Sequence, residues 1–129
     1  MYPRSESRPA ILLVDDEPTL RRIVRLVLEK AGFRVIDAAD GAEALVRFDE
    51  CAAEIGLVVT DLSMPGLSGR ELTQRLKARV PTLKVLLISG DPDDSESESE
   101  RWIEKPFELS VLADKVRRML GHPSVEVDP

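Results

Sequence analysis

Short apolar runs alternate with amphipathic stretches along most of this 129-residue chain. The apolar runs have the length and composition of strands buried on both faces of a sheet. The stretches between them carry apolar residues at the three- and four-residue spacing of a helix packed on a core. Because strands that alternate with helices through short, right-handed crossovers form parallel sheets, the pattern predicts a doubly wound α/β fold with a five-stranded parallel sheet.

The ends of the expected elements can be located from the sequence. We predict strands at 10–14, 34–38, 56–60, 84–88 and 102–104, and helices over 17–31, 40–51, 68–80 and 109–120. Pro18 suits a first helical turn, Ser68 and Glu71 fit a capping box, and Gly32 and Pro81 suit helix ends. The elements account for most of the chain between its two ends.

The length fits one folded domain. We expect a flexible leader over 1–8, the domain over 9–121 and a tail over 122–129. The leader has no apolar segment typical of a secretion signal, and no apolar run approaches the ~20 residues of a membrane span. A single cysteine, Cys51, fits a reducing compartment, so we expect a cytoplasmic protein without membrane contact.

The net charge of −6 has a local origin. Residues 91–100 contain six of the 24 acids, and the other 18 balance the 18 lysines and arginines, so nothing indicates nucleic-acid binding. This segment has only Asp, Glu, Ser and Pro, and no apolar residue to pack on a sheet. We therefore predict a solvated loop in which a fourth, intervening helix is shortened or missing.

Polar residues recur where the predicted strands end. Asp15 and Asp16 follow the first strand, Asp61 the third, Ser89 the fourth and Lys105 the fifth. Ligands of doubly wound sheets bind at the carboxyl ends of the strands, so these side chains should meet in one crevice. Carboxylates that converge repel one another unless a cation neutralises them, and oxygen ligands suit Mg²⁺.

Each of these residues also has a structural explanation. Adjacent acids after a strand often cap a helix, and Asp61 could belong to the turn before Pro65 and Gly66. A serine at a strand end and an exposed lysine are both common. The positions of all five at one edge of the sheet favour a functional site.

Four short segments resemble the motifs of a known family. Residues 13–17 are similar to its acidic opening, 60–66 to its phospho-acceptor loop, 88–90 to its switch hydroxyl and 105–107 to its closing Lys-Pro signature. All four stand in the family's order and on matching predicted elements. On these motifs the chain is identified as a member of the response regulator receiver (CheY-like) family over 9–120, which implies a flavodoxin-like fold and two-component signal transduction.

The resemblance implies a role for each residue of the crevice. Asp61 would be the nucleophile that takes a phosphoryl group. The Mg²⁺ ion would be held by the carboxylates of Asp16 and Asp61, by the backbone carbonyl of Ser63 and, through water, by Asp15. A carboxylate needs no general base, so charge neutralisation and in-line positioning would carry the transfer.

The remaining roles concern the response to phosphorylation. Ser89 would bind the new phosphoryl oxygens, and Lys105 would pair with a charge that exists only after the transfer. The Lys105–Pro106 bond is expected to be cis. Trp102 occupies the position of the family's switch aromatic, although a core tryptophan on an edge strand would explain it as well. Only fifteen residues separate Ser89 from Lys105, fewer than is usual in the family.

The implied partner is a sensor histidine kinase or a phosphotransfer protein of a phosphorelay. The residues at 64–72 and 88–90 are most similar to those of receivers attached to hybrid sensor histidine kinases. The domain would be a signalling phospho-acceptor rather than an enzyme. Two alternatives remain: a pseudo-receiver that binds proteins without being phosphorylated, and an aspartyl-nucleophile phosphatase, whose second acid is replaced here by Ser63. The sequence indicates no oligomeric state.

Overall fold

The computed structural model describes residues 9–90 and 102–120, which form five strands and four helices. In chain order they are β1 (Ala10–Val14), α2 (Pro18–Lys30), β2 (Arg34–Ala38), α3 (Gly41–Cys51), β3 (Ile55–Asp61), α4 (Gly69–Arg79), β4 (Lys84–Ser89), β5 (Trp102–Glu104) and α5 (Leu109–Leu120). The predicted loss of a helix between β4 and β5 concerns 91–100, which lie outside the described residues.

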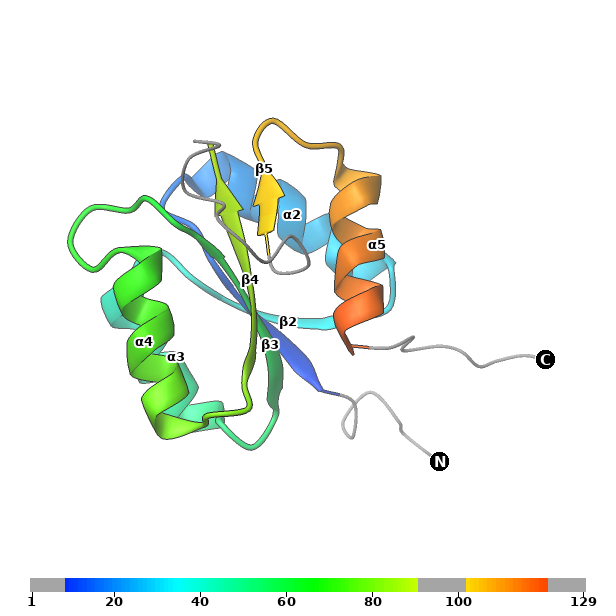
Figure 1. The fold of residues 1–129 in the computed structure, drawn as a ribbon. Helices are drawn as coiled ribbons and strands as arrows, with labels where there is room; N and C mark the ends of the chain where they lie inside the picture. The colour runs from blue at the N-terminus through cyan, green and yellow to red at the C-terminus, as the bar shows by residue number, and fades with distance from the viewer. Residues whose placement is uncertain (1–8, 91–101, 121–129) are drawn as a thin grey trace, which may run out of the picture.

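The five strands form one parallel sheet in the order β2-β1-β3-β4-β5. Figure 1 shows α3 and α4 on one face of this sheet and α2 and α5 on the other. Because the strand order reverses direction at β1, the chain winds first along one half of the sheet and then along the other. The predicted doubly wound, flavodoxin-like fold is confirmed.

Alternate residues of the central strands supply two separate cores. In β1, Ile11 and Leu13 face the core beneath α2 and α5, whereas Leu12 and Val14 face the core beneath α3 and α4. All five residues of β1 are buried, so this strand has no exposed face. Continuous burial explains the unbroken apolar run in the sequence, and it fixes the end of β1 within the molecule.

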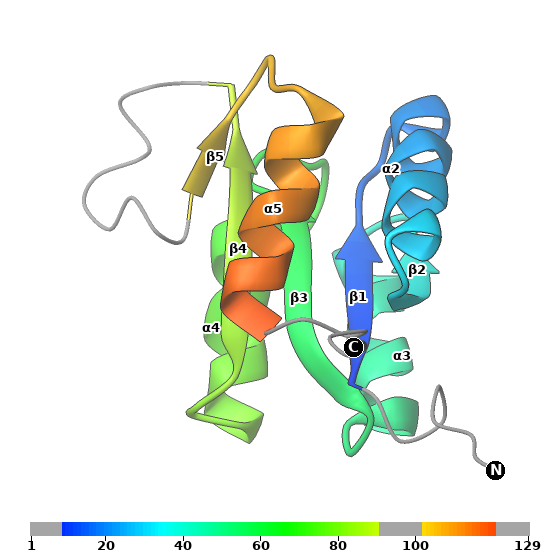
Figure 2. The ribbon, with the colours of Figure 1, turned by 90° about the vertical axis from the view of Figure 1, so that its right-hand side faces the viewer.

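Three helices begin with side-chain caps at the carboxyl edge of the sheet, which points upward in Figure 2. Glu17 accepts the N–H of Leu20, and Asp40 accepts the N–H of Glu43. Ser68 and Glu71 form the predicted capping box. These caps turn the chain sharply from strand or loop into helix, so polar residues gather at this edge.

Strand β3 runs one residue further than predicted at each end. The N–H of Leu62 still donates to the carbonyl of Ile88 at 2.8 Å, which keeps the end of β3 attached to β4. Asp61 is therefore the last residue of a central strand and not part of a free turn. Asp61 pairs with Ile88 of β4, and the preceding residue, Thr60, pairs with Val14 of β1.

Candidate functional site

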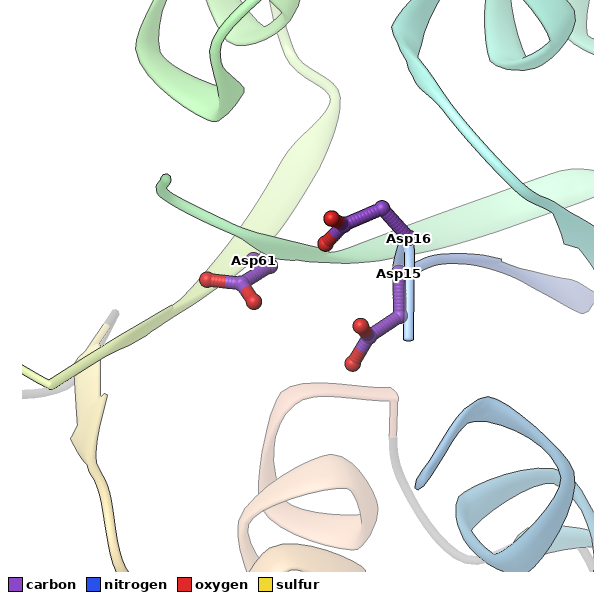
Figure 3. Close-up of side chains that lie close together, drawn as sticks. All are labelled: Asp15, Asp16 and Asp61. Atoms are coloured by element: carbon purple, nitrogen blue, oxygen red, sulfur yellow. The ribbon is translucent and has the colours of Figure 1, made fainter. Parts of the chain in front are cut away.

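Three carboxylates meet at the carboxyl edge of the sheet. Asp15, Asp16 and Asp61 each place an oxygen within 4.8 Å of the others. Figure 3 shows the side chains of Asp15 and Asp16 at the end of β1, beside Asp61 at the end of the neighbouring strand β3. Asp15 and Asp61 are buried, whereas Asp16 is exposed. The predicted convergence of the three acids is thus present in the fold.

The backbone and one carboxylate oxygen of Asp15 are hydrogen-bonded to the start of α2 and to the adjacent strand β2. Its N–H donates to Ala38 on β2 at 3.2 Å, and its Oδ1 accepts the N–H of Glu17 at 2.9 Å. The guanidinium of Arg21 donates to its backbone carbonyl at 2.7 Å. Arg21 also pairs with Asp37 at 3.4 Å, which joins the end of β1 to β2.

The pKa of Asp15 is raised above its ordinary value of 3.8, mainly because the carboxyl is buried away from water. The N–H of Glu17 opposes this shift, and so does the charge of Lys105, while the charges of Asp61 and Asp16 add to it. The pocket therefore disfavours the state in which all three carboxyl groups are ionised. A cation bound among them would reduce the repulsion between their charges.

Lys105 forms an ion pair with Asp61, in which the ammonium lies 2.9 Å from Oδ2. The expected pairing of this lysine with a charge created by phosphoryl transfer is therefore incomplete, because the lysine already has a partner in Asp61. Burial lowers the pKa of Lys105, but the hydrogen bond to Asp61 and the charges of the three acids outweigh it, so the net shift is upward. The lysine is charged before any reaction.

Two serines lie near Asp61, one on the neighbouring strand β4 and one two residues further along the chain. Ser89 is the last residue of β4 and is buried, one position beyond Ile88, which pairs with Asp61. Ser63 is exposed, and its N–H donates to Oδ1 of Asp61 at 3.3 Å. The two carboxylate oxygens of Asp61 are thus bound by different groups, Oδ1 by a backbone N–H and Oδ2 by the Lys105 ammonium.

The fifth strand and the residues after it contain two further sequence candidates, Trp102 and Pro106. The N–H of Lys105 donates to the carbonyl of Ser89 at 2.7 Å, and the Lys105–Pro106 peptide bond is cis. Trp102 is half-buried and pairs with Leu87 of β4. The guanidinium of Arg70, the second residue of α4, lies over the Trp102 ring at 5.9 Å from its centroid. Sequence reasoning missed Arg70 because no local pattern links it to β5.

An apolar groove of about 610 Å³ opens beside Lys105 on the side of α2 and α5. It is lined by residues from α2, from the position after β4, from the segment that joins β5 to α5 and from the start of α5, namely Leu20, Ile23, Gly90, Lys105, Pro106, Phe107 and Leu109. Ile23 is 40% exposed, so part of the groove wall is apolar surface open to solvent. The site is therefore bordered by apolar surface.

The residues of the pocket fit a hard divalent cation. Three carboxylates face one ammonium, so negative charge is in excess among the side chains described, and carboxylate and carbonyl oxygens are the ligands that Mg²⁺ prefers. No nitrogen or sulfur ligand takes part in the cluster, which argues against a zinc site. The donor set supports a metal site without identifying the ion.

Comparison with known proteins gives a consistent family. The model of the response regulator receiver domain matches residues 11–117. The response regulator receiver protein CpdR of Brucella abortus is 34% identical over 116 residues, which are 85% of this chain and 95% of that protein. The sensor kinase CckA of the same organism is also 34% identical over 116 residues, or 85% of this chain, but these cover only 12% of the kinase.

Solved structures agree. The receiver domain of the hybrid histidine kinase CckA has a TM-score of 0.75 and 33% identity, covering 86% of this chain and 98% of that one. The response regulator TrrA of Thermotoga maritima, solved in complex with Mg²⁺ and BeF, has a TM-score of 0.77 and 29% identity over 87% of this chain and 99% of that one. The fold and its acidic edge thus define a signalling receiver module.

The chain belongs to the response regulator receiver family of two-component systems. The relatives include a hybrid kinase, and the residues of the motifs at 64–72 and 88–90 predicted a likeness to receivers of this kind. They also include CpdR, nearly all of which this chain spans. The longest described helix, α2, has 13 residues, and no described helix is suited to crossing a bilayer.

Proposed function

We propose that this chain is a phospho-accepting receiver domain, spanning 9–121, that takes a phosphoryl group on Asp61 with the help of Mg²⁺. The donor would be a phosphohistidine on a sensor histidine kinase or on a phosphotransfer protein. The observation that carries the proposal is the pairing of Asp61 with Lys105 at 2.9 Å inside a cluster of three carboxylates. A nucleophile, a cation and candidate metal ligands are thus within reach of one another.

The chemistry suits a buried carboxylate. An oxygen of Asp61 would bond to phosphorus while the bond between phosphorus and the imidazole nitrogen breaks, and the nitrogen would keep that electron pair. A carboxylate is already deprotonated, so the step requires positioning and charge stabilisation but no general base. The N–H of Ser63 and the ammonium of Lys105 hold the two oxygens of Asp61 in a fixed orientation before attack.

Each remaining residue stabilises the product or holds the metal. Lys105 would transfer its ion pair from the Asp61 carboxylate to the new phosphoryl oxygens, which carry the charge after the step. Ser89, buried at the end of the adjacent strand, would donate its hydroxyl to another of these oxygens. Asp16, Asp61 and the backbone carbonyl of Ser63 would bind Mg²⁺ directly, and Asp15 would bind it through water.

When bound, Mg²⁺ would neutralise the acids and the incoming phosphoryl oxygens. The raised pKa of Asp15 supports this part of the proposal, because it indicates that the metal-free pocket disfavours ionised carboxylates. The complex of TrrA with Mg²⁺ and BeF is a further support, since that receiver shares this fold at 29% identity.

The experiment is phosphorylation by a small phosphodonor, such as acetyl phosphate, with and without Mg²⁺. We expect one phosphate per chain, stable in acid and labile in base, and no phosphate in Asp61→Asn. The control is Asp49→Asn, which removes an exposed acid that pairs with Arg79. Equal phosphate on Asp61→Asn, or none on the unmodified chain, would defeat the proposal. The latter result would favour the pseudo-receiver.

A further inference from the structure

We propose that the contact between Arg70 and Trp102 couples the occupancy of Asp61 to the position of β5, and that it opposes the phosphorylated state. The inference rests on the proposed function, since it assigns a regulatory contact to the same site. It makes Arg70 a positioning residue, because it lies outside the pocket and acts through Trp102. Three contacts, taken in turn, form a closed path from Asp61 back to Asp61.

The first contact fixes the start of α4 to the backbone of Asp61. The N–H of Gly69 donates to the carbonyl of Leu62 at 2.8 Å. A Cβ atom at Gly69 would lie 2.8 Å from Cα of Leu62 and closer still to the carbonyl oxygen of Asp61, so only glycine fits. Because the two backbones are in contact here, the first turn of α4 cannot move independently of the phospho-acceptor.

The second contact joins α4 to the edge of the sheet. Arg70 follows Gly69 directly, and its guanidinium lies over the ring of Trp102 at 5.9 Å. Among aromatic rings the indole attracts a cation most strongly, and arginine is the cation found most often in such pairs. The ring belongs to a strand of three residues that pairs only with β4 among the described strands.

The third contact returns to the acceptor. Lys105 follows β5 directly, three residues after Trp102, and its ammonium lies 2.9 Å from Asp61. A phosphoryl group on Asp61 would move the negative charge outward from the backbone of β3, and the ammonium would follow it. Since β5 is short and lies at the edge of the sheet, displacement of Lys105 is passed to the strand. Since α4 is held by Gly69, the displacement is taken up between Arg70 and Trp102.

Removal of this contact should therefore make the activated state easier to reach. We expect Arg70→Met, which keeps the length of the side chain but not its charge, to bind beryllofluoride in saturating Mg²⁺ about two- to fivefold more tightly than the unmodified chain. A change in affinity of about two- to fivefold is the effect expected from losing the interaction energy of one exposed cation–π pair. Arg70→Lys keeps a cation over the ring and should lie between the two.

The titration can be followed by fluorescence, because Trp102 is the only tryptophan. Its emission should change on addition of beryllofluoride, and in Arg70→Met the starting spectrum should already be shifted toward that of the bound form. The matched control is Arg75→Met, an exposed arginine further along α4. Calorimetry on Trp102→Leu completes a double-mutant cycle, in which Arg70→Met should have no further effect if it acts through the ring.

Three outcomes would overturn the inference: Arg70→Met binding no more tightly than Arg75→Met, Arg70→Met binding more weakly than the unmodified chain, or an undiminished effect of Arg70→Met in Trp102→Leu. Failure of the proposed function would look different. In that case the unmodified chain would not bind beryllofluoride in an Mg²⁺- and Asp61-dependent manner, whereas failure of the coupling alone would leave that binding intact.

Discussion

The two sides of the Asp61 pocket are built differently. Asp15 and Asp16 follow β1, an interior strand whose five residues are all buried between two helical layers. Lys105 follows β5, an edge strand of three residues, and its side chain is 33% exposed. Asp61 lies between them on the central strand. One side of the pocket is anchored in both cores, and the other is anchored mainly through a single neighbouring strand.

This difference in construction suits the two sides to two tasks, the binding of a metal ion and the response to a bound phosphoryl group. A metal site needs ligands that are preorganised, and on the acid side Asp15 is buried and hydrogen-bonded through its backbone and its carboxylate. A signal requires a part of the molecule that moves when charge is added, and few contacts oppose movement of a short edge strand. Substitutions on the acid side should therefore change metal affinity, whereas those on the lysine side should change the response to a bound phosphoryl analogue.

The largest effect should come from removing an acid. Asp16→Asn should lose measurable Mg²⁺ binding, because it takes away an exposed carboxylate that belongs to the cluster without supporting the fold. Asp49→Asn serves as the matched control, with unchanged affinity. Binding can be measured by tryptophan fluorescence or calorimetry. Similar Mg²⁺ affinity in both variants would place the metal elsewhere. It would also contradict the assignment of metal binding to the acid side of the pocket.

The attachment of α4 to the acceptor strand can be tested at Gly69. In Gly69→Ala the new methyl group would overlap the backbone of Asp61 and Leu62, so we expect a loss of about 1–3 kcal/mol in the free energy of unfolding, as for other overpacked sites. Gly90→Ala is the control, since a Cβ atom there meets nothing within 4 Å. Urea denaturation gives both values. Equal stability of the two variants would show that α4 is not held against the acceptor.

Arg21 offers a smaller test of the acid side. It orients the peptide between Asp15 and Asp16 through a bond of 2.7 Å to the Asp15 carbonyl. Arg21→Met should weaken Mg²⁺ binding about tenfold, the lower end of the range for residues that support metal ligands. Arg22→Met changes the neighbouring, exposed arginine and should have little effect. If both variants bind Mg²⁺ equally well, the acid side does not depend on this support.

The smallest effect concerns pH in the metal-free protein. The pKa of Asp15 is higher in the folded state than its ordinary value of 3.8, so the unfolded chain loses this proton first as the pH rises. The folded state is then disfavoured progressively between 3.8 and the folded-state pKa. Relative to Asp15→Asn, the unmodified chain should lose stability across that window when measured with a chelator present. A constant difference would contradict the raised pKa.

Much of this molecule follows from local sequence patterns. The predicted bounds of β1, β2 and β5 match the structure, because apolar runs flanked by turn and capping residues mark buried strands clearly. The gathering of Asp15, Asp61 and Lys105 was also predictable, since parallel strands place their carboxyl ends at one edge. These features depend on the order of elements and not on the details of side-chain packing.

The contacts that organise the site were not predictable in the same way. Arg70 and Trp102 are distant in the sequence, and whether they meet depends on how α4 crosses the sheet. The bond from Arg21 to the carbonyl of Asp15 depends on the rotamer of a long side chain. The ion pair of Lys105 with Asp61 before phosphorylation was not predicted, because the sequence places the lysine at this edge of the sheet without showing which oxygen its ammonium reaches.

The most direct test of the central claim is to locate the phosphate itself. Borohydride reduces an aspartyl phosphate to homoserine, so the chain can be treated with acetyl phosphate and Mg²⁺, reduced, digested and sequenced by mass spectrometry. We predict homoserine at position 61 in the sample with Mg²⁺ and aspartate there in the sample with a chelator. Intact aspartate at 61 in both samples, or homoserine at another acid, would contradict the assignment of Asp61 as the phospho-acceptor.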